Sequence, residues 1–268
     1  MTVPIFHLNA FTTHPFAGNP AAVCPLTNWL DDDLLRSVAA ENNLSETAFF
    51  VPHDDFYELR WFTPRCEVKL CGHATLTSAW VLLQILAPEC NSVRFATRFS
   101  GMLAVERQGE LLAMDFPSLE PWPSTEPPSA LIKGLKIPPS SVVQLEDNYF
   151  AIYESEEDVR KVRPDFALLQ KLHPAGVAIT APGNDVDFVS RYFAPSYGIP
   201  EDPVTGSTHC SLAPYWGRRL GKTNLHARQV SARGGELWCE VRNDRVIIKG
   251  NAVLTLRGEL FIDQMDLG

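Results

Sequence analysis

Apolar and polar residues alternate in many short runs along this chain, a pattern typical of half-buried strands. Turn-forming residues separate most of these runs, so each is expected to be one strand. For the runs between residues 92 and 116 the simplest arrangement is a meander. The predicted strands cover residues 3–10, 21–24, 46–51, 57–62, 92–95, 102–107, 111–116, 142–145, 150–153, 176–179, 187–193, 225–230, 236–241, 245–249 and 253–256.

A second pattern, with apolar residues three and four positions apart, predicts helices. The helix that follows Gly72 carries Leu76, Ala79 and Leu83 on one face. Further helices are expected at 29–40, 156–163, 165–172 and 207–220. The last of these contains Pro214, which should bend or shorten it, and Gly221 is a plausible end.

Two stretches of the chain repeat one pattern. Residues 60–80 and 191–216 both begin with Arg, two aromatic residues, a small residue and Pro. In each copy an acid follows, Glu67 or Asp202, and then a glycine turn, Gly72 or Gly206, opens a helix. The first turn of a helix leaves backbone N–H groups unpaired, which suits an anionic ligand. The chain therefore looks like a duplicated unit of the α+β class.

A proline-rich segment at 117–128, PSLEPWPSTEPP, is the best candidate for a domain boundary. It carries five prolines and shows no periodicity. Such a segment has few backbone donors and favours a stiff, extended connector. We therefore expect an N-terminal half at 1–116 and a C-terminal half at 129–268. The last strand is a candidate to return to the N-terminal half.

The composition and charge of the chain argue against several classes of function. The chain has 268 residues, 45% hydrophobic and 21% charged, close to the average of soluble globular proteins. Its formal net charge of -9 argues against nucleic-acid or membrane-surface partners, which favour basic faces. The N-terminus shows no signal-peptide pattern, and no run approaches the ~20 apolar residues of a membrane span. A cytoplasmic location is expected, and the six cysteines, Cys71 apart, are interpreted mostly as small buried residues.

Several common catalytic motifs are missing from the sequence. It contains no G-x-G-x-x-G, no Walker loop, no H-E-x-x-H and no G-x-S-x-G. Nicotinamide, nucleotide-hydrolysis, zinc-protease and serine-hydrolase functions therefore lose their support. A metal site from His73, Asp202, His209 and Cys210 would match no standard ligand spacing, so no metal is expected.

Four motifs resemble those of the phenazine-biosynthesis PhzF family. They are GNPAAV at Gly18–Val23, NNLSETAFF at Asn42–Phe50, RWFTP with CGHAT within Arg60–Thr75, and EDPVTGS at Glu201–Ser207. The resemblance spans the chain. It implies a diaminopimelate epimerase-like fold: two similar halves, each a barrel-like, mostly antiparallel sheet around a central helix, with the active site in the cleft between them.

The resemblance also implies a set of functional residues. In the PhzF enzyme these groups are thought to isomerise a dihydro-hydroxyanthranilate by moving a proton between ring carbons, without a cofactor. A homodimer is a further implication. The matching residues of this chain are Glu46, Gly72, His73, Asp202, Gly206 and Ser207.

The resemblance gives these residues roles. Glu46 would be the general acid and base, and burial can raise the pKa of a glutamate above the ~4.3 of a model peptide. His73 and Asp202 would form an imidazole–carboxylate pair that orients the substrate or relays a second proton. Ser207, with the N–H groups at Gly72 and Gly206, would hold the substrate carboxylate. The expected function is a cofactor-independent isomerase acting on a small, carboxylate-bearing metabolite.

Cys71 keeps two alternatives open. Two-base epimerases of this fold use one thiol on each glycine turn, and Cys71 stands where the first thiol would be. Thr205 occupies the matching place before Gly206, and a hydroxyl is far too weak an acid to replace a thiolate. A thiol-dependent epimerase or racemase using Cys71 is thus the second hypothesis. Cys71 is also a candidate substrate contact. The third hypothesis is a binding or regulatory member of the family without catalysis.

Overall fold

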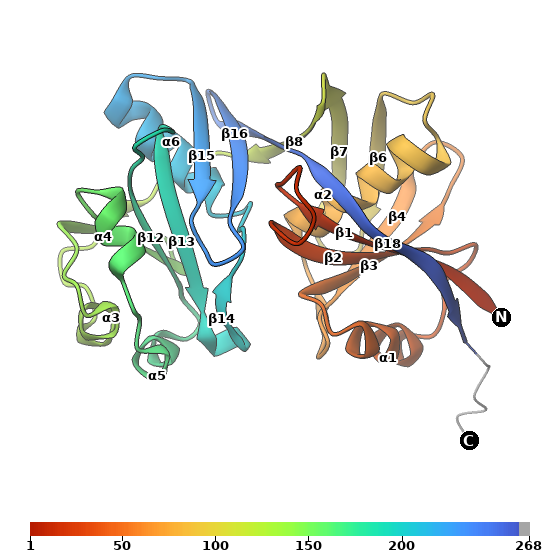
Figure 1. Ribbon diagram of the computed structural model, residues 1–268, viewed down its shortest axis with the longest axis horizontal. Coiled ribbons are helices and arrows are strands. Elements are labelled where there is room, and N and C mark those ends of the chain that lie inside the picture. The colour runs from red at the N-terminus through yellow and green to blue at the C-terminus, as the bar shows by residue number, and fades with distance from the viewer. Residues whose placement is uncertain (263–268) are drawn as a thin grey trace. The chain divides into compact units, whose positions relative to one another are not determined.

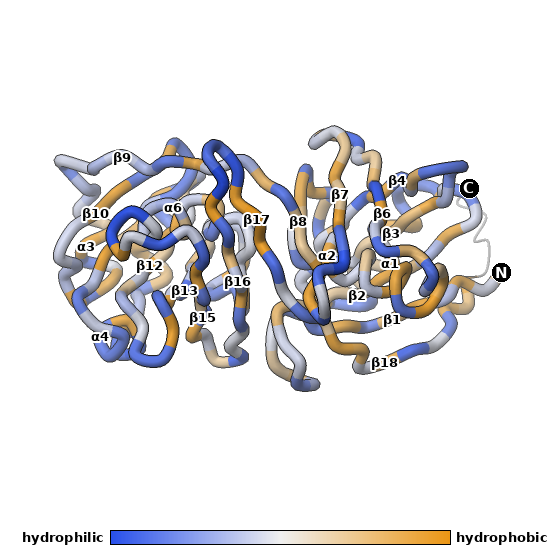
Figure 2. The backbone as a smooth tube through the Cα atoms, turned by 90° about the horizontal axis from the view of Figure 1, so that it is seen from above, coloured by the Kyte–Doolittle hydropathy of each residue, from blue (hydrophilic) through white to orange (hydrophobic). Residues whose placement is uncertain are grey.

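The computed structural model describes residues 1–262, and they form two compact units. The first unit contains residues 1–115 together with the returning segment 250–262. The second unit is the continuous segment Phe116–Lys249. The second unit is therefore inserted into the chain of the first. Along both units, hydrophobic and hydrophilic segments alternate on the strands (Figure 2).

The first unit is built on one mixed sheet with the order β18-β1-β2-β3-β4-β6-β7-β8. The first and last strands run side by side in opposite directions, with Thr2 opposite Phe261 (Figure 1). The short β5 pairs with β4. The strands are β1 (Thr2–Ala10), β2 (Asn19–Pro25), β3 (Glu46–Pro52), β4 (Tyr57–Phe62), β5 (Glu67–Val68), β6 (Ser92–Thr97), β7 (Gly101–Gln108), β8 (Leu111–Pro117) and β18 (Ala252–Phe261).

Two of the neighbouring strand pairs are parallel, namely β2 with β3 and β4 with β6. Parallel neighbours need a crossover, and a helix supplies each one. Helix α1 (Asp32–Asn42) links the first pair, and helix α2 (Gly72–Val81) with a π-helical turn (Leu82–Leu86) links the second. The expected meander is confirmed for β6 to β8, where all pairs are antiparallel.

The two helices cover opposite faces of this sheet (Figure 1). Asp31 caps α1, and its side chain accepts a backbone N–H of the first turn. The buried residues Leu35 and Val38 of α1 share a hydrophobic cluster with Phe49 and Phe62 of the sheet. Helix α2 is buried on almost every side and packs on β1, β2 and β3. Because nearly all of its residues are buried, the polar His73, Thr75, Thr77 and Ser78 included, α2 is the central helix of the unit.

The second unit repeats this architecture. Its order is β9-β10-β11-β12-β13-β15-β16-β17, and β14 pairs with β13. The strands are β9 (Trp122–Pro123), β10 (Ser141–Gln144), β11 (Asn148–Ile152), β12 (Gly176–Pro182), β13 (Phe188–Ala194), β14 (Ile199–Asp202), β15 (Asn224–Gln229), β16 (Gly235–Arg242) and β17 (Arg245–Gly250). The helices are α3 (Ser129–Leu135), α4 (Glu156–Lys161), α5 (Phe166–Leu169), the 3-10 turns η2 (Gln170–Leu172) and η3 (Pro195–Tyr197), and α6 (His209–Leu220).

The succession of strand directions is the same in both units. Read along each sheet, the pairs are antiparallel, antiparallel, parallel, antiparallel, parallel, antiparallel and antiparallel. Helix α6 takes the place of α2. It is one continuous helix across Pro214, and Gly221 ends it in the left-handed conformation, as the sequence predicts. The structure thus describes a duplicated fold.

The proline-rich segment belongs to the second unit. Trp122 and Pro123 pair with β10, and the backbone N–H of Ser124 donates to Val142. The N–H of Leu119 donates to the carbonyl of Cys210 in α6. The segment expected as a linker is thus held by backbone hydrogen bonds, because several of its residues other than proline keep their N–H donors.

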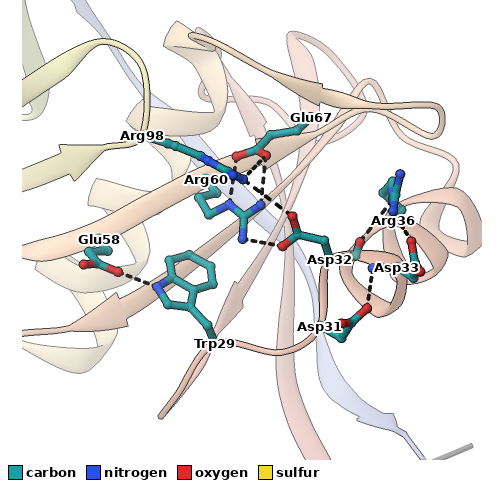
Figure 3. A network of polar contacts seen from close by, with 9 residues as sticks. All are labelled: Trp29, Asp31, Asp32, Asp33, Arg36, Glu58, Arg60, Glu67 and Arg98. Carbon is teal, nitrogen blue, oxygen red and sulfur yellow. Dashed lines mark hydrogen bonds and ion pairs between the residues drawn. The ribbon is translucent and has the colours of Figure 1, made fainter.

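An arginine–glutamate pair recurs at the same place in each unit. Nε and Nη2 of Arg60 each lie 2.8 Å from a carboxylate oxygen of Glu67. Arg191 binds Glu201 in the same bidentate way, with Nε and Nη2 at 2.7 and 2.9 Å from the two carboxylate oxygens. Two parallel N–H···O bonds make this geometry both strong and specific. Figure 3 shows the pair in the first unit, where Asp32 and Arg98 join it.

This repeat corrects the sequence alignment of the two halves. The sequence matched Glu67 with Asp202, whereas the structural counterpart of Glu67 is Glu201. Asp202 lies opposite Tyr192 in the sheet, as Val68 lies opposite Trp61. The turn before α6 is longer than the turn before α2, and sequence spacing alone did not reveal the difference.

Candidate functional site

Glu46 and the start of α2 come together inside the first unit. Glu46 is the first residue of β3 and lies opposite Ala21 of the parallel strand β2. Helix α2 begins at Gly72, after Cys71 in extended conformation. Because α2 packs on β2 and β3, its first turn brings Cys71 and His73 to the end of β3 where Glu46 stands.

The closest contact in this cluster joins Glu46 and His73. Oε2 of Glu46 lies 3.0 Å from Nε2 of His73, and both side chains are about nine-tenths buried, at 12% and 9% exposure. The angle at this contact is too far from linear for a hydrogen bond. Among residues 1–262, Oε2 therefore has no hydrogen-bond partner with suitable geometry. A buried carboxylate oxygen beside an imidazole is therefore available to a bound molecule.

Two residues that the sequence did not single out, Asn19 and Ser45, complete the cluster. Nδ2 of the fully buried Asn19 lies 3.3 Å from Nδ1 of His73. The hydroxyl of Ser45 donates to Oδ1 of Asn19 at 3.3 Å, which turns the amide nitrogen toward the ring. In this arrangement Nδ1 of neutral His73 accepts, and its Nε2–H faces Glu46. Both residues lie inside quoted motifs, so the signal was present.

Burial and neighbouring charge act on the two titratable groups of α2. Burial raises the pKa of the Cys71 thiol, and the charge of Glu46 raises it further. For His73, burial alone would lower the pKa, but Cys71 and Glu46 outweigh it and raise the pKa above the ordinary value. Burial and the neighbouring carboxylate thus disfavour the Cys71 thiolate, and the charge of Glu46 favours the protonated imidazole of His73.

Glu46, Cys71 and His73 are the residues here that could hold a metal, since their ligand atoms lie within 4.8 Å of one another. The sulfur is 3.5 Å from Nδ1 and 3.9 Å from Nε2 of His73. Because it is nearly equidistant from both nitrogens, it lies beside the ring and not on the Nε2 side that faces Glu46. A metal in line with Nε2 could not reach the sulfur without side-chain rotation, so the cluster is not a preformed tetrahedral site.

Asp202 belongs to the second unit, at the end of β14. The hydroxyl of Thr205 donates to its carboxylate. The buried Gln229 fixes the same loop, because its amide nitrogen donates to the carbonyl of Asp202 at 2.8 Å and its oxygen accepts from the N–H of Thr205 at 2.9 Å. Within the first unit the carboxylate beside His73 is Glu46. The expected pairing of His73 with Asp202 stays a prediction.

The turn before α6 carries Gly206 and Ser207. Gly206 is buried and Ser207 is exposed, so the serine side chain is accessible. His209 follows with no exposed surface, and its Nδ1 lies 2.8 Å from the carbonyl of Thr205. Burial lowers the pKa of His209 to about 4, which keeps the ring neutral. This supports a structural role for His209.

The family model for phenazine biosynthesis-like proteins matches residues 8–258 of this chain. The chain belongs to the PhzF, or phenazine biosynthesis-like, family. A protein of Pseudomonas aeruginosa named an uncharacterized isomerase is 52% identical over 98% of this chain and all of its own length.

Solved structures extend the PhzF comparison to the fold. The crystal structure of a PhzF family protein from Enterococcus faecalis matches with a TM-score of 0.94, at 44% identity, over 98% of this chain and 100% of that one. A predicted epimerase from P. aeruginosa, 24% identical, matches with a TM-score of 0.73 over 97% and 100% of the two chains. The α+β fold is therefore diaminopimelate epimerase-like, as predicted.

These comparisons bear on activity at a coarse level. PhzF membership and the name of the Pseudomonas relative support an isomerase- or epimerase-type function for this chain. Among the helices of residues 1–262, none combines the length and the apolar character that crossing a membrane requires.

Proposed function

We propose that this protein is a cofactor-independent isomerase of the PhzF type, which moves a proton between carbons of a small carboxylate-bearing metabolite. Glu46 is the proposed general acid and base. The observation that carries this proposal is the buried Oε2 of Glu46, 3.0 Å from Nε2 of His73 and free of an aligned hydrogen bond among residues 1–262. Such an oxygen can give a proton to one carbon and take one from another on the same face of a ligand.

The internal repeat supports a single proton carrier. Glu46 begins β3, and the second unit has Gly176 at the start of β12. Each of these residues opens a strand that pairs in parallel with the strand before it. The duplicated fold therefore supplies one glutamate and no counterpart at the matching position, which suits a one-acid shift better than a symmetric two-acid mechanism.

His73 is proposed to support Glu46. Its Nε2 lies 3.0 Å from Oε2 of Glu46, and its raised pKa favours an imidazolium whose positive charge stands beside the carboxylate left when Glu46 gives its proton to the substrate. Asn19 and Ser45 hold the ring in the required tautomer. His73 can therefore lower the cost of each proton transfer without leaving its place.

Substrate binding is proposed at the starts of the two central helices. In the first unit the residues are Gly72 and Cys71, where the N–H groups of the first turn of α2 favour a carboxylate. In the second unit they are Gly206 and the exposed Ser207, while Asp202 keeps its proposed role of orienting the substrate or relaying a second proton. An anionic group on the metabolite would thus be fixed by backbone donors.

A thiol-dependent epimerase using Cys71 is the second candidate. The sulfur lies 3.5 Å from Nδ1 of His73, as a thiol activated by an imidazole would. Burial and the charge of Glu46 nevertheless raise the pKa of this thiol. The reactive thiolate is therefore disfavoured, and the glutamate is the stronger candidate.

The test is a mass-shift assay in D₂O with a panel of cyclic and acyclic carboxylates, beginning with the dihydro-hydroxyanthranilate. Wild-type protein should exchange or isomerise one class of compound. Glu46→Gln should lower the rate by about 10²- to 10⁴-fold, the usual contribution of a general acid or base. The exposed Glu106 of β7 gives a matched control, because Glu106→Gln removes a carboxylate from a strand that pairs with β6 and β8 and not with β3.

The Cys71→Ser variant separates the remaining hypotheses. Activity that survives in Cys71→Ser but not in Glu46→Gln supports the proposal. The opposite pattern would establish the thiol-dependent epimerase. Binding of a panel compound with no exchange in wild-type protein would favour a non-catalytic member of the family.

A further inference from the structure

Two polar atoms on the inner face of the first unit are buried and lack hydrogen-bond partners among the described residues. One is Oε2 of Glu46, and the other is Nε1 of Trp61. The first is an acceptor and the second is a donor. Leaving a buried polar group unpaired costs about 1–3 kcal/mol, so each such group in a native protein calls for an explanation.

Both side chains lie on the same face of the sheet. Trp61 in β4 is directly opposite Ala48 in β3, and Glu46 is two residues before Ala48. Side chains two residues apart on a strand point to the same face. Trp61 and Glu46 are therefore diagonal neighbours, a relationship of about 7–8 Å that long and aromatic side chains bridge.

The second unit shows how far an aromatic residue at this position reaches. Tyr192 in β13 lies opposite Ala178, and Gly176 is two residues before Ala178, so Tyr192 matches Trp61 and Gly176 matches Glu46. A Cβ added to Gly176 would come within 2.0 Å of the Tyr192 hydroxyl oxygen. An aromatic side chain in this place thus extends to the very residue that corresponds to Glu46.

The aromatic side chain carries a hydrogen-bond donor in both units, the Tyr192 hydroxyl or the Trp61 indole N–H, but among the described residues only the second unit has a protein acceptor for it. The Tyr192 hydroxyl donates to Oδ1 of Asn148 at 2.9 Å. Asn148 lies opposite Gly176, and in the first unit Ala21 lies opposite Glu46. Alanine has no side-chain acceptor, so the first unit keeps an aromatic donor beside Glu46 while lacking its protein acceptor.

We infer that the indole N–H of Trp61 and the Oε2 of Glu46 share one oxygen atom of a bound molecule. Such an oxygen must accept from Trp61 and donate to the carboxylate, which only a hydroxyl-type oxygen does. In the free protein this is a water molecule. If the protein is the isomerase proposed above, the indole N–H of Trp61 binds an oxygen of the metabolite in place of this water. Trp61 then determines which carbon of the metabolite faces Glu46.

Indole N–H signals of ¹⁵N-labelled protein test this inference without any substrate. The Trp61 signal, assigned by its loss in Trp61→Phe, should shift with pH as Glu46 gains a proton. The shift should vanish in Glu46→Gln and persist in His73→Gln. Trp216 is the matched control, because its buried Nε1–H donates to Thr180 at 2.9 Å, and its signal should stay unchanged in Glu46→Gln. A Trp61 signal with the same pH response in wild type and Glu46→Gln overturns the inference.

An activity measurement extends the test once a substrate is found. Trp61→Phe keeps the ring and removes the N–H, and we expect kcat/KM to fall about 10- to 100-fold, the loss that accompanies one hydrogen bond in a dry site. Trp216→Phe should leave kcat/KM within about twofold. If Trp61→Phe lowers only thermal stability, with kcat/KM intact, the role of Trp61 is packing and the inference is wrong. If no substrate turns over, the proposed function fails, whereas the NMR result still decides the inference.

Discussion

Glu46 and Gly176 occupy the same position in the two repeated units. Each opens a strand that runs parallel to the preceding strand and antiparallel to the following one. In the first unit the position carries a carboxylate against His73, and in the second it is closed by the Tyr192 side chain. The duplicated scaffold therefore differs at this pair of matched positions, with a buried carboxylate in one unit and a packed glycine in the other.

A side chain at Gly176 should destabilise the second unit. In Gly176→Ala the new Cβ would meet the Tyr192 hydroxyl at 2.0 Å, and the half-buried ring would have to move. We expect a loss of about 1–3 kcal/mol in the free energy of unfolding, measured by urea denaturation. Gly258→Ala is the control, since its Cβ would meet only atoms at 3.8 Å. Equal stability of the two variants would contradict the packing described for Gly176.

The Glu46 charge should control the protonation of His73. The folded-state pKa of His73 is raised above the ~6.5 of a free histidine, in part by Glu46. NMR titration of the imidazole should show a lower His73 pKa in Glu46→Gln than in wild type. In Glu58→Gln, which affects His53 instead, the His73 pKa should match wild type. An unchanged His73 pKa in Glu46→Gln would refute the coupling.

The same shift predicts how stability depends on pH. A raised pKa means that the folded protein binds the His73 proton more tightly than the unfolded chain does. The resulting stabilisation is complete below pH ~6.5 and is lost as pH rises through the folded-state pKa. Urea denaturation of wild type and Glu46→Gln across this range should show a weaker pH dependence in the variant. Parallel curves would mean that His73 does not contribute.

The buried arginine pair should matter far more than an exposed one. Arg191, with 10% of its side chain exposed, holds Glu201 and also donates to the carbonyls of Val159 and Val162. Arg191→Met leaves a largely buried carboxylate unpaired, and we expect a loss of about 3 kcal/mol or more. Arg94→Met, at a pair with 54% exposure, should cost at most about 1 kcal/mol. Comparable losses in the two variants would show that burial does not set the strength of these pairs.

The cysteines should divide into two classes of reactivity. All six are free; Cys66 and Cys90 are exposed, and the remaining four, including Cys71, are buried. A chromogenic disulfide reagent should therefore titrate two thiols rapidly in native protein and all six after denaturation. Cys66→Ser should remove one fast thiol and Cys71→Ser none. A fast third thiol that disappears in Cys71→Ser would revive the thiol-dependent mechanism.

Local patterns predicted most of the secondary structure. Alternation located every long strand, and the spacing of apolar residues located α1, α2 and α6, because these elements bury one face or all faces. The short elements α3, β5, β9 and β14 were missed, since two to seven residues carry too little periodicity. The interpretation of cysteines as buried was wrong for Cys66 and Cys90, which lie on the surface.

Long-range relationships were harder to predict. The parallel pairing of β2 with β3 depends on a crossover helix, and the counterpart of Glu67 depends on strand register. Neither the strand pairing nor the register can be predicted from a short window of sequence. For the candidate site, the motifs named Glu46 and His73, but the contact between them arises only when α2 packs on β3.

The pairing of β1 with β18 has a consequence for synthesis of the chain. Strand β1, at residues 2–10, lacks its outer neighbour until residues 252–261 have been synthesised. The second unit, Phe116–Lys249, is one continuous segment and needs no later part of the chain. During translation the inserted unit can fold while the first is still missing an edge. The Glu46 cluster therefore lies in the unit that is completed last, so premature termination would leave a folded inserted unit and an incomplete first unit.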